Sequence, residues 1–164
     1  MIKGEISGKE NVSTRLHSEC LTGDVFGSKR CDCGEQLERA LEELEEKGEG
    51  VLIYLRQEGR GIGLINKLKA YNLQDEGYDT IEANHQLGFG DDMRDYAVAA
   101  QIIKDLDIKS VSIMTNNPGK INGLEKYGIK VSSREELEIE SNDTDRNYLK
   151  TKKYKMGHIL KQNL

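Results

Sequence analysis

Short blocks of apolar residues alternate along the chain with two different periods. Residues 12–17 predict a strand, and the continuous apolar run over residues 50–56 predicts a strand that is buried on both faces of a parallel sheet. Between them, apolar side chains recur at helical spacing over residues 36–44 until Gly48, which predicts a helix that ends at this glycine. The first third of the chain therefore has the order strand, helix, strand.

The rest of the chain repeats this alternation. We expect helices over residues 63–74, 97–106 and 121–127, a short helix opened by the capping box at residues 79–82, and a last helix through residues 148–152. Further strands are expected over residues 110–115 and 129–132. Alternating strands and helices are typical of an α/β fold, so we predict a single domain over residues 1–164 with a largely parallel or mixed sheet flanked by helices.

Composition and charge narrow the class of protein. Of the 164 residues 36% are hydrophobic and 32% charged, with a net charge of −5, which argues against a general binder of nucleic-acid backbones. The apolar runs are too short to span a bilayer and the start lacks the apolar part of a signal peptide, so we expect a cytoplasmic protein with no membrane partner. The basic residues Lys150, Lys152, Lys153 and Lys155 are interpreted as a solvated patch.

Three cysteines form the pattern Cys20-x10-Cys31-x-Cys33. Three thiolates can meet at one tetrahedral metal ion, and a site with three protein ligands leaves a position for water, which is the catalytic arrangement of zinc. His17 could instead close the site and make it structural, and free buried cysteines are the third alternative. Spacing alone leaves these alternatives open.

Two loops between a strand and a helix have the composition of anion sites. Residues 56–63 combine glycines with Arg56 and Arg60 at a helix start, where backbone N–H groups favour phosphate. Residues 115–120 offer a hydroxyl, two amides and Lys120. Each loop also has a purely structural interpretation. The first can be a tight turn, and the second an Asn/Pro turn with a solvated lysine.

Several other polar residues are ambiguous. Asp92 and Arg94 lie near an expected helix start, where a carboxylate can be a simple N-cap. Tyr71 lies on an amphipathic helix and would ordinarily be a core residue. His85 and His158 would ordinarily be unremarkable polar residues.

The ordered motifs of the chain resemble those of the GTP cyclohydrolase II family of riboflavin biosynthesis. The segments that carry the resemblance run from residue 4 to residue 160 in the family's order: 15–24, 30–34, 56–64, 73–75, 79–84, 87–89, 115–118 and 155–158. The chain starts almost at the strand that leads to Arg15, so we expect it to lack the family's usual N-terminal strands. The family's proline after Arg134 is also absent, with Glu135 and Glu136 in its place.

The resemblance implies a site. It implies zinc on Cys20, Cys31 and Cys33 with water as the fourth ligand, Asp92 as proton acceptor, Arg94 as nucleophile and Tyr71 near the guanine. Residues implied to bind GTP are Arg15, Leu16, His17, Ser18, Glu19, Gln36, Glu58, Gly59, Arg60, Thr80, Thr115 and Lys120. We further expect Mg²⁺ with the triphosphate, and a homodimer.

The expected activity is zinc-dependent hydrolysis of GTP to a diaminopyrimidinone ribosylamine 5′-phosphate, with release of formate and pyrophosphate. Because an arginine has a pKa near 12 or above, Arg94 could act as a charge clamp instead of a nucleophile. Two other functions stay open: a family variant that releases a formylated pyrimidine or GMP, and a non-catalytic, zinc-stabilised nucleotide-binding module.

Overall fold

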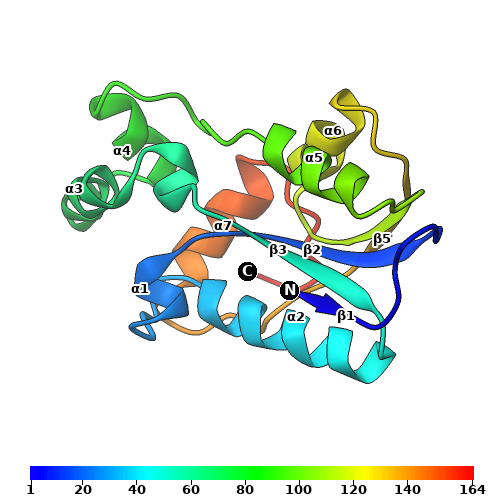
Figure 1. The fold of residues 1–164 in the computed structure, drawn as a ribbon. Helices are drawn as coiled ribbons and strands as arrows, with labels where there is room; N and C mark the ends of the chain where they lie inside the picture. The colour runs from blue at the N-terminus through cyan, green and yellow to red at the C-terminus, as the bar shows by residue number, and fades with distance from the viewer.

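A five-stranded sheet in the order β1-β3-β2-β4-β5 forms the centre of the computed structural model, which describes all residues from 1 to 164 (Figure 1). The strands are β1 (Ile2–Lys3), β2 (Val12–Ser18), β3 (Gly50–Leu55), β4 (Val111–Met114) and β5 (Val131–Glu135). Strands β2 to β5 pair in parallel, and β1 pairs antiparallel with the edge of β3. The predicted α/β class with a largely parallel, mixed sheet is confirmed.

Seven α-helices and one short 3₁₀ helix surround the sheet. They are α1 (Leu21–Asp24), α2 (Cys33–Lys47), η1 (Glu58–Gly61), α3 (Leu64–Asp75), α4 (Thr80–Gln86), α5 (Ala97–Asp105), α6 (Pro118–Lys126) and α7 (Arg146–Tyr154). Helix α2 ends at Gly48 in the left-handed conformation, and the capping box of Asp79 and Glu82 opens α4, as the sequence predicts. None of the helices is both long and apolar enough to cross a membrane.

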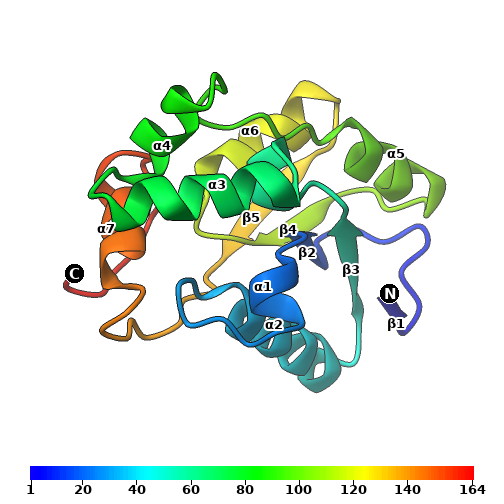
Figure 2. The same ribbon diagram turned by 90° about the vertical axis from the view of Figure 1, so that its left-hand side faces the viewer.

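The two faces of the sheet carry two separate apolar clusters. On one face, Val12 and Leu16 of β2 pack with the apolar side of α5 and with Leu124 of α6. On the other face, Ala40 and Leu44 of α2 pack against β3 and β4. Figure 2 shows α2 on one side of the sheet and α5 and α6 on the other. On the α2 face, β2 presents Arg15, whose Nη2 donates to Gln36 of α2 at 2.8 Å, so alternate residues of β2 contact different layers.

The carboxyl ends of β2, β3 and β4 meet at one edge of the sheet, because these strands are parallel and adjacent. The segments that follow them are α1, η1 with α3, and the loop before α6. Open parallel sheets bind ligands outside this edge. The fold therefore brings the cysteine pattern and both candidate anion loops to the same end of the molecule.

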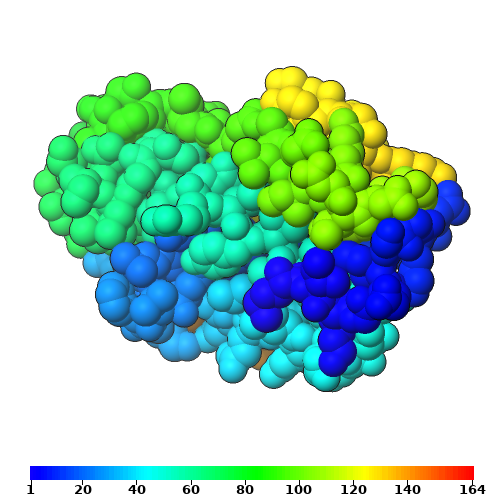
Figure 3. All heavy atoms as spheres, viewed as in Figure 1, coloured from blue at the N-terminus to red at the C-terminus, as the bar shows by residue number.

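Three details of the fold differ from expectation. Strand β5 begins at Val131, two residues later than predicted, and ends at Glu135, three residues later; the Ile129 N–H donates instead to the Leu124 carbonyl at the end of α6. Helix α1 and η1 are too short to give a periodic pattern, and the sequence does not predict them. Strand β1 is also unpredicted; in Figure 3 its segment, in dark blue, lies on the surface beside α2 and α5.

Candidate functional site

One cavity at the carboxyl ends of the strands gathers most of the polar residues singled out in the sequence. Its empty space, with the open mouth included, is about 1180 Å³. Predicted site residues that line it are Arg15, His17, Ser18, Glu19, Cys20, Cys31, Cys33, Gln36, Glu58, Gly59, Arg60, Tyr71, Thr80, Arg94, Thr115 and Lys120. The fold thus unites segments that are 100 residues apart.

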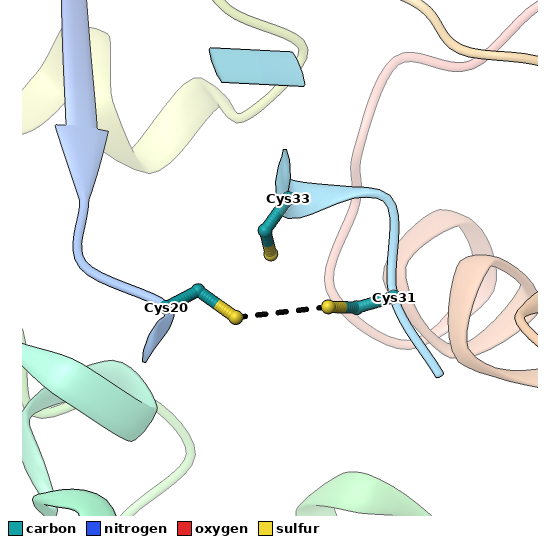
Figure 4. Close-up of side chains that lie close together, drawn as sticks. All are labelled: Cys20, Cys31 and Cys33. Atoms are coloured by element: carbon teal, nitrogen blue, oxygen red, sulfur yellow. Dashed lines mark hydrogen bonds between the residues drawn. The ribbon is translucent and has the colours of Figure 1, made fainter. Parts of the chain in front are cut away.

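The three cysteines converge on one point, as Figure 4 shows. Cys20 follows the end of β2, Cys33 is the first residue of α2, and Cys31 lies two residues before it. The three sulfur atoms lie within 4.8 Å of one another, with Cys20 and Cys31 3.6 Å apart. Thiolates about 2.3 Å from a tetrahedral ion lie about 3.8 Å apart, so this donor set fits zinc.

The residues around the three cysteines leave room for closely spaced sulfur atoms and supply a positive charge beside them. A Cβ atom on Gly23 would lie 3.2 Å from both the Cys20 and Cys31 sulfurs, so only glycine fits there without displacing them. The Lys67 ammonium lies 3.1 Å from the Cys20 sulfur and 2.9 Å from Glu58. Hydrogen bonds from Cys31 and Cys33, together with the charge of Lys67, lower the pKa of Cys20. The cluster is therefore prepared to hold a thiolate.

His17 does not join the cysteine cluster. Its Nε2 lies 2.9 Å from Asp24, whose carboxylate also accepts hydrogen bonds from the Tyr54 hydroxyl and the Cys20 backbone N–H. Burial lowers the pKa of His17 below its ordinary value. The other ring nitrogen, Nδ1, is buried without a partner in a residue that lines the cavity. The alternative in which His17 closes a structural metal site is therefore wrong in this geometry.

The glycine loop forms η1 and presents Arg60 to the cavity. Gly59 and Arg60 both adopt left-handed backbone angles, which is uncommon for arginine. The Arg60 carbonyl accepts a hydrogen bond from the Met93 N–H, which helps to hold this conformation. Both terminal nitrogens of Arg60 are buried and have no partner in the protein. Buried donors are almost always paired, so these two point to a missing acceptor.

The loop before α6 is not a solvated turn. Lys120 is buried and donates to the Leu16 carbonyl at 2.6 Å, so the interpretation of this residue as a solvated lysine is wrong. Burial lowers the pKa of Lys120 well below its ordinary value, and the charges of Arg15 and Arg94 lower it further. Such a cluster of buried cations is stabilised by an anion.

Asp92 and Arg94 form a two-point ion pair. Arg94 Nε donates to one carboxylate oxygen at 2.8 Å, and Nη2 donates to the other. Burial lowers the pKa of Arg94, but the bonds to Asp92 outweigh this effect and hold it above its ordinary value. Helix α5 begins only at Ala97, so the interpretation of Asp92 as a helix N-cap is wrong. Arg94 lines the cavity, whereas Asp92 is not among the residues that line it.

Tyr71 lies at the cavity wall and is not a core residue. Its hydroxyl lies 3.4 Å from the Thr22 hydroxyl, and the cationic groups of Arg30 and Lys67 lie 5.2 Å and 5.7 Å from the centre of its ring. Burial raises the pKa of Tyr71 above its ordinary value. The phenol therefore stays protonated at neutral pH, beside the cysteine cluster.

Some residues differ from their predicted places. The Leu16 side chain lies in the core, so only its backbone is near the cavity. Conversely, Lys67, Tyr148, Lys152 and His158 line the cavity and were not predicted. Lys67 precedes Tyr71 by four residues on α3, and this helical spacing could have revealed it. Burial and the nearby charges of Lys152, Arg94 and Arg60 lower the pKa of His158 to about 3.

Comparison with known proteins agrees with this geometry. A family model of GTP cyclohydrolase II matches residues 1–136. A riboflavin biosynthesis protein RibBA of Endomicrobium trichonymphae is 57% identical over 99% of this chain and 40% of its own length. The RibBA protein of Bacillus subtilis (strain 168) is 59% identical over 93% of this chain and 38% of its own. The chain thus spans about two fifths of the length of these relatives.

Proposed function

Because the chain belongs to the GTP cyclohydrolase II family, we propose that it hydrolyses GTP, releasing formate and pyrophosphate and leaving a diaminopyrimidinone ribosylamine 5′-phosphate. We assign this reaction to the first step of riboflavin biosynthesis, the process named in the relatives' titles. One observation carries the proposal: a three-thiol cluster and unpartnered guanidinium nitrogens of Arg60 face the same cavity. A reaction on both the base and the phosphates of one nucleotide needs both kinds of group.

Cys20, Cys31 and Cys33 would hold the zinc ion. When bound, zinc lowers the pKa of a coordinated water toward about 7 and so supplies hydroxide for attack on the imidazole ring of guanine. The nearby Tyr71 hydroxyl orients the ring by a hydrogen bond. The family resemblance gives Asp92 the role of proton acceptor. Its carboxylate is ionised, because the hydrogen bond and charge of Arg94 outweigh the effect of burial and hold its pKa below the ordinary value. In this structure both of its oxygens accept from Arg94 and it does not line the cavity, so a role as base requires this ion pair to open.

The triphosphate takes the cationic side of the cavity. Arg60 offers two free donors, and the buried Arg15 adds positive charge. Lys120, whose pKa is lowered by burial, would be held protonated by the phosphates when they bind. When Mg²⁺ accompanies GTP, it would offset the remaining negative charge of the triphosphate. Together these groups stabilise the charge that develops as pyrophosphate departs. Homodimer formation and a cytoplasmic location stay predictions, and the mass of the protein in solution checks the first.

The direct test is incubation with GTP, zinc and Mg²⁺, with formate and pyrophosphate measured separately and the pyrimidine identified by mass spectrometry. We expect equal amounts of formate and pyrophosphate. Pyrophosphate without formate, with a formylated pyrimidine or GMP as product, would identify a family variant. Tight GTP binding with neither product would identify a non-catalytic binding module.

Metal analysis is a second test. We expect one zinc per chain, removable by strong chelators, because three thiolates with an open position hold the ion in an accessible site. A protein that contains no zinc after expression and takes up none on titration would contradict the assignment of the cysteines.

A Tyr71→Phe variant separates orientation from binding. We expect kcat for formate release to fall at least about tenfold, the effect of one hydrogen bond made in the transition state, while GTP affinity changes little. Equilibrium binding of a non-hydrolysable GTP analogue supplies the comparison, and Tyr154→Phe at an exposed position is the control. If affinity collapses while the remaining turnover gives the normal products, Tyr71 serves binding instead.

A further inference from the structure

The C-terminal helix α7 places a cation on the loop that carries two of the three cysteines. Lys152 Nζ donates to Asp32 Oδ1 at 2.6 Å, and Asp32 lies between Cys31 and Cys33. Both side chains are buried, with 10% of the lysine and 3% of the aspartate exposed. This ion pair joins two segments that are 120 residues apart.

The Asp32 carboxylate does not cap the helix that follows it. Asp32 is the N-cap residue of α2, but its side chain makes no capping hydrogen bond. It accepts instead from Lys152 and from the Gln36 amide, and Gln36 in turn accepts from Arg15 Nη2 at 2.8 Å. A hydrogen-bonded chain therefore runs from α7 through the cysteine loop to β2.

Helix α7 is anchored firmly enough to act as a support. Leu149 is fully buried, and the Asp145 carboxylate at the helix start accepts two hydrogen bonds from Asn142. Beyond the helix end, Lys155 pairs with Asp79, and the Ile159 N–H donates to the Asn116 carbonyl at 2.8 Å. Lys152 thus projects from a segment that is fixed on both sides.

Lys152 matters for the cysteine loop because its ammonium group neutralises the buried Asp32 carboxylate. Without the ammonium group, the Asp32 carboxylate would be a buried, uncompensated anion next to two metal-binding thiolates. Removing one partner of a buried ion pair is strongly unfavourable, and the loop would move to bring the carboxylate to water. Any such movement displaces Cys31 and Cys33, which flank Asp32 in the chain.

We propose that Lys152 is a positioning residue of the metal centre, and that it acts through Asp32 to hold the Cys31–Cys33 loop in the geometry that binds the ion. The inference rests on the proposed zinc site and adds to it a part of the chain that lies beyond residues 1–136, the region matched by the family model. The lysine acts on the ligands without touching the metal.

The test compares zinc affinity by chelator competition in four variants at one pH. We expect Lys152→Met to weaken zinc binding by about 10- to 100-fold, the usual effect of removing an outer partner of a metal ligand. Lys152→Arg should retain most of the affinity, and the double variant D32N/K152M should recover most of it because no buried charge is left unpaired. Lys150→Met is the matched control, since Lys150 lies on the same helix and makes no hydrogen bond or ion pair.

A second measurement separates positioning from general stability. In the cobalt-substituted protein, we expect Lys152→Met to alter the thiolate-to-metal absorption bands, and the double variant to restore them. If the wild type binds zinc and Lys152→Met binds it equally well, the inference is overturned and the proposed function stands. An affinity loss that matches a loss of thermal stability in the metal-free protein, without recovery in the double variant, also overturns it. A wild type without zinc overturns both.

Discussion

Replacing Cys33 by serine is expected to abolish formate release while some pyrophosphate release remains. Cys33 supplies one of only three thiols, and the three sulfurs lie within 4.8 Å of one another, so two ligands would be left. Loss of a direct ligand should cost well over the about 10- to 100-fold that loss of an outer partner costs. Arg60 and Lys120, which also line the cavity, are not altered by this substitution and remain for the phosphates.

The measurement is the ratio of formate to pyrophosphate in a variant shown to be folded and free of zinc. Circular dichroism and the affinity for GTP report on the fold, and Cys31→Ser should give the same ratio because its sulfur has an equivalent place. A folded, zinc-free Cys33→Ser protein that releases formate at the normal rate would show that the metal is structural. The proposed mechanism would then be wrong.

Elements whose signals are local were predicted well. The end of α2 at Gly48 and the start of α4 at Asp79 both follow from short-range chemistry, the first from a left-handed glycine and the second from a capping box. The meeting of three strand ends at one edge also follows, because it needs only the alternation of strands and helices. The cysteine cluster and the two loops line one cavity, as the family resemblance implies.

Features that depend on distant partners were not predictable. Arg60 adopts a left-handed conformation that no local signal indicates, and its carbonyl is held by the N–H of Met93. Lys152 has the sequence context of a solvated basic face, and only the fold brings it to Asp32. The interpretation of residues 150–155 as a solvated patch is therefore wrong at Lys152. The interpretation of His158 as an ordinary polar residue is also wrong, because it lines the cavity.

Replacing Arg94 by alanine is expected to lower pyrophosphate release by about 10²- to 10³-fold, the usual cost of losing one group that stabilises charge in the transition state. Arg94 is well placed for this, because Asp92 holds two of its nitrogens and Nη1 has no hydrogen-bond partner in the protein. Its side chain is only 11% exposed. Arg146→Ala, at an exposed position of α7, is the control.

The geometry favours a clamp over a nucleophile at Arg94. Its pKa is held above the ordinary value by Asp92, so the guanidinium keeps its proton and has no free electron pair for attack on phosphorus. A clamp needs only positive charge, so Arg94→Lys should restore much of the rate of pyrophosphate release, and formate release should depend little on this side chain. If Arg94→Lys is as inactive as Arg94→Ala and formate release falls with pyrophosphate release in both, a covalent guanylyl intermediate on Arg94 would explain the result, and the clamp would be ruled out.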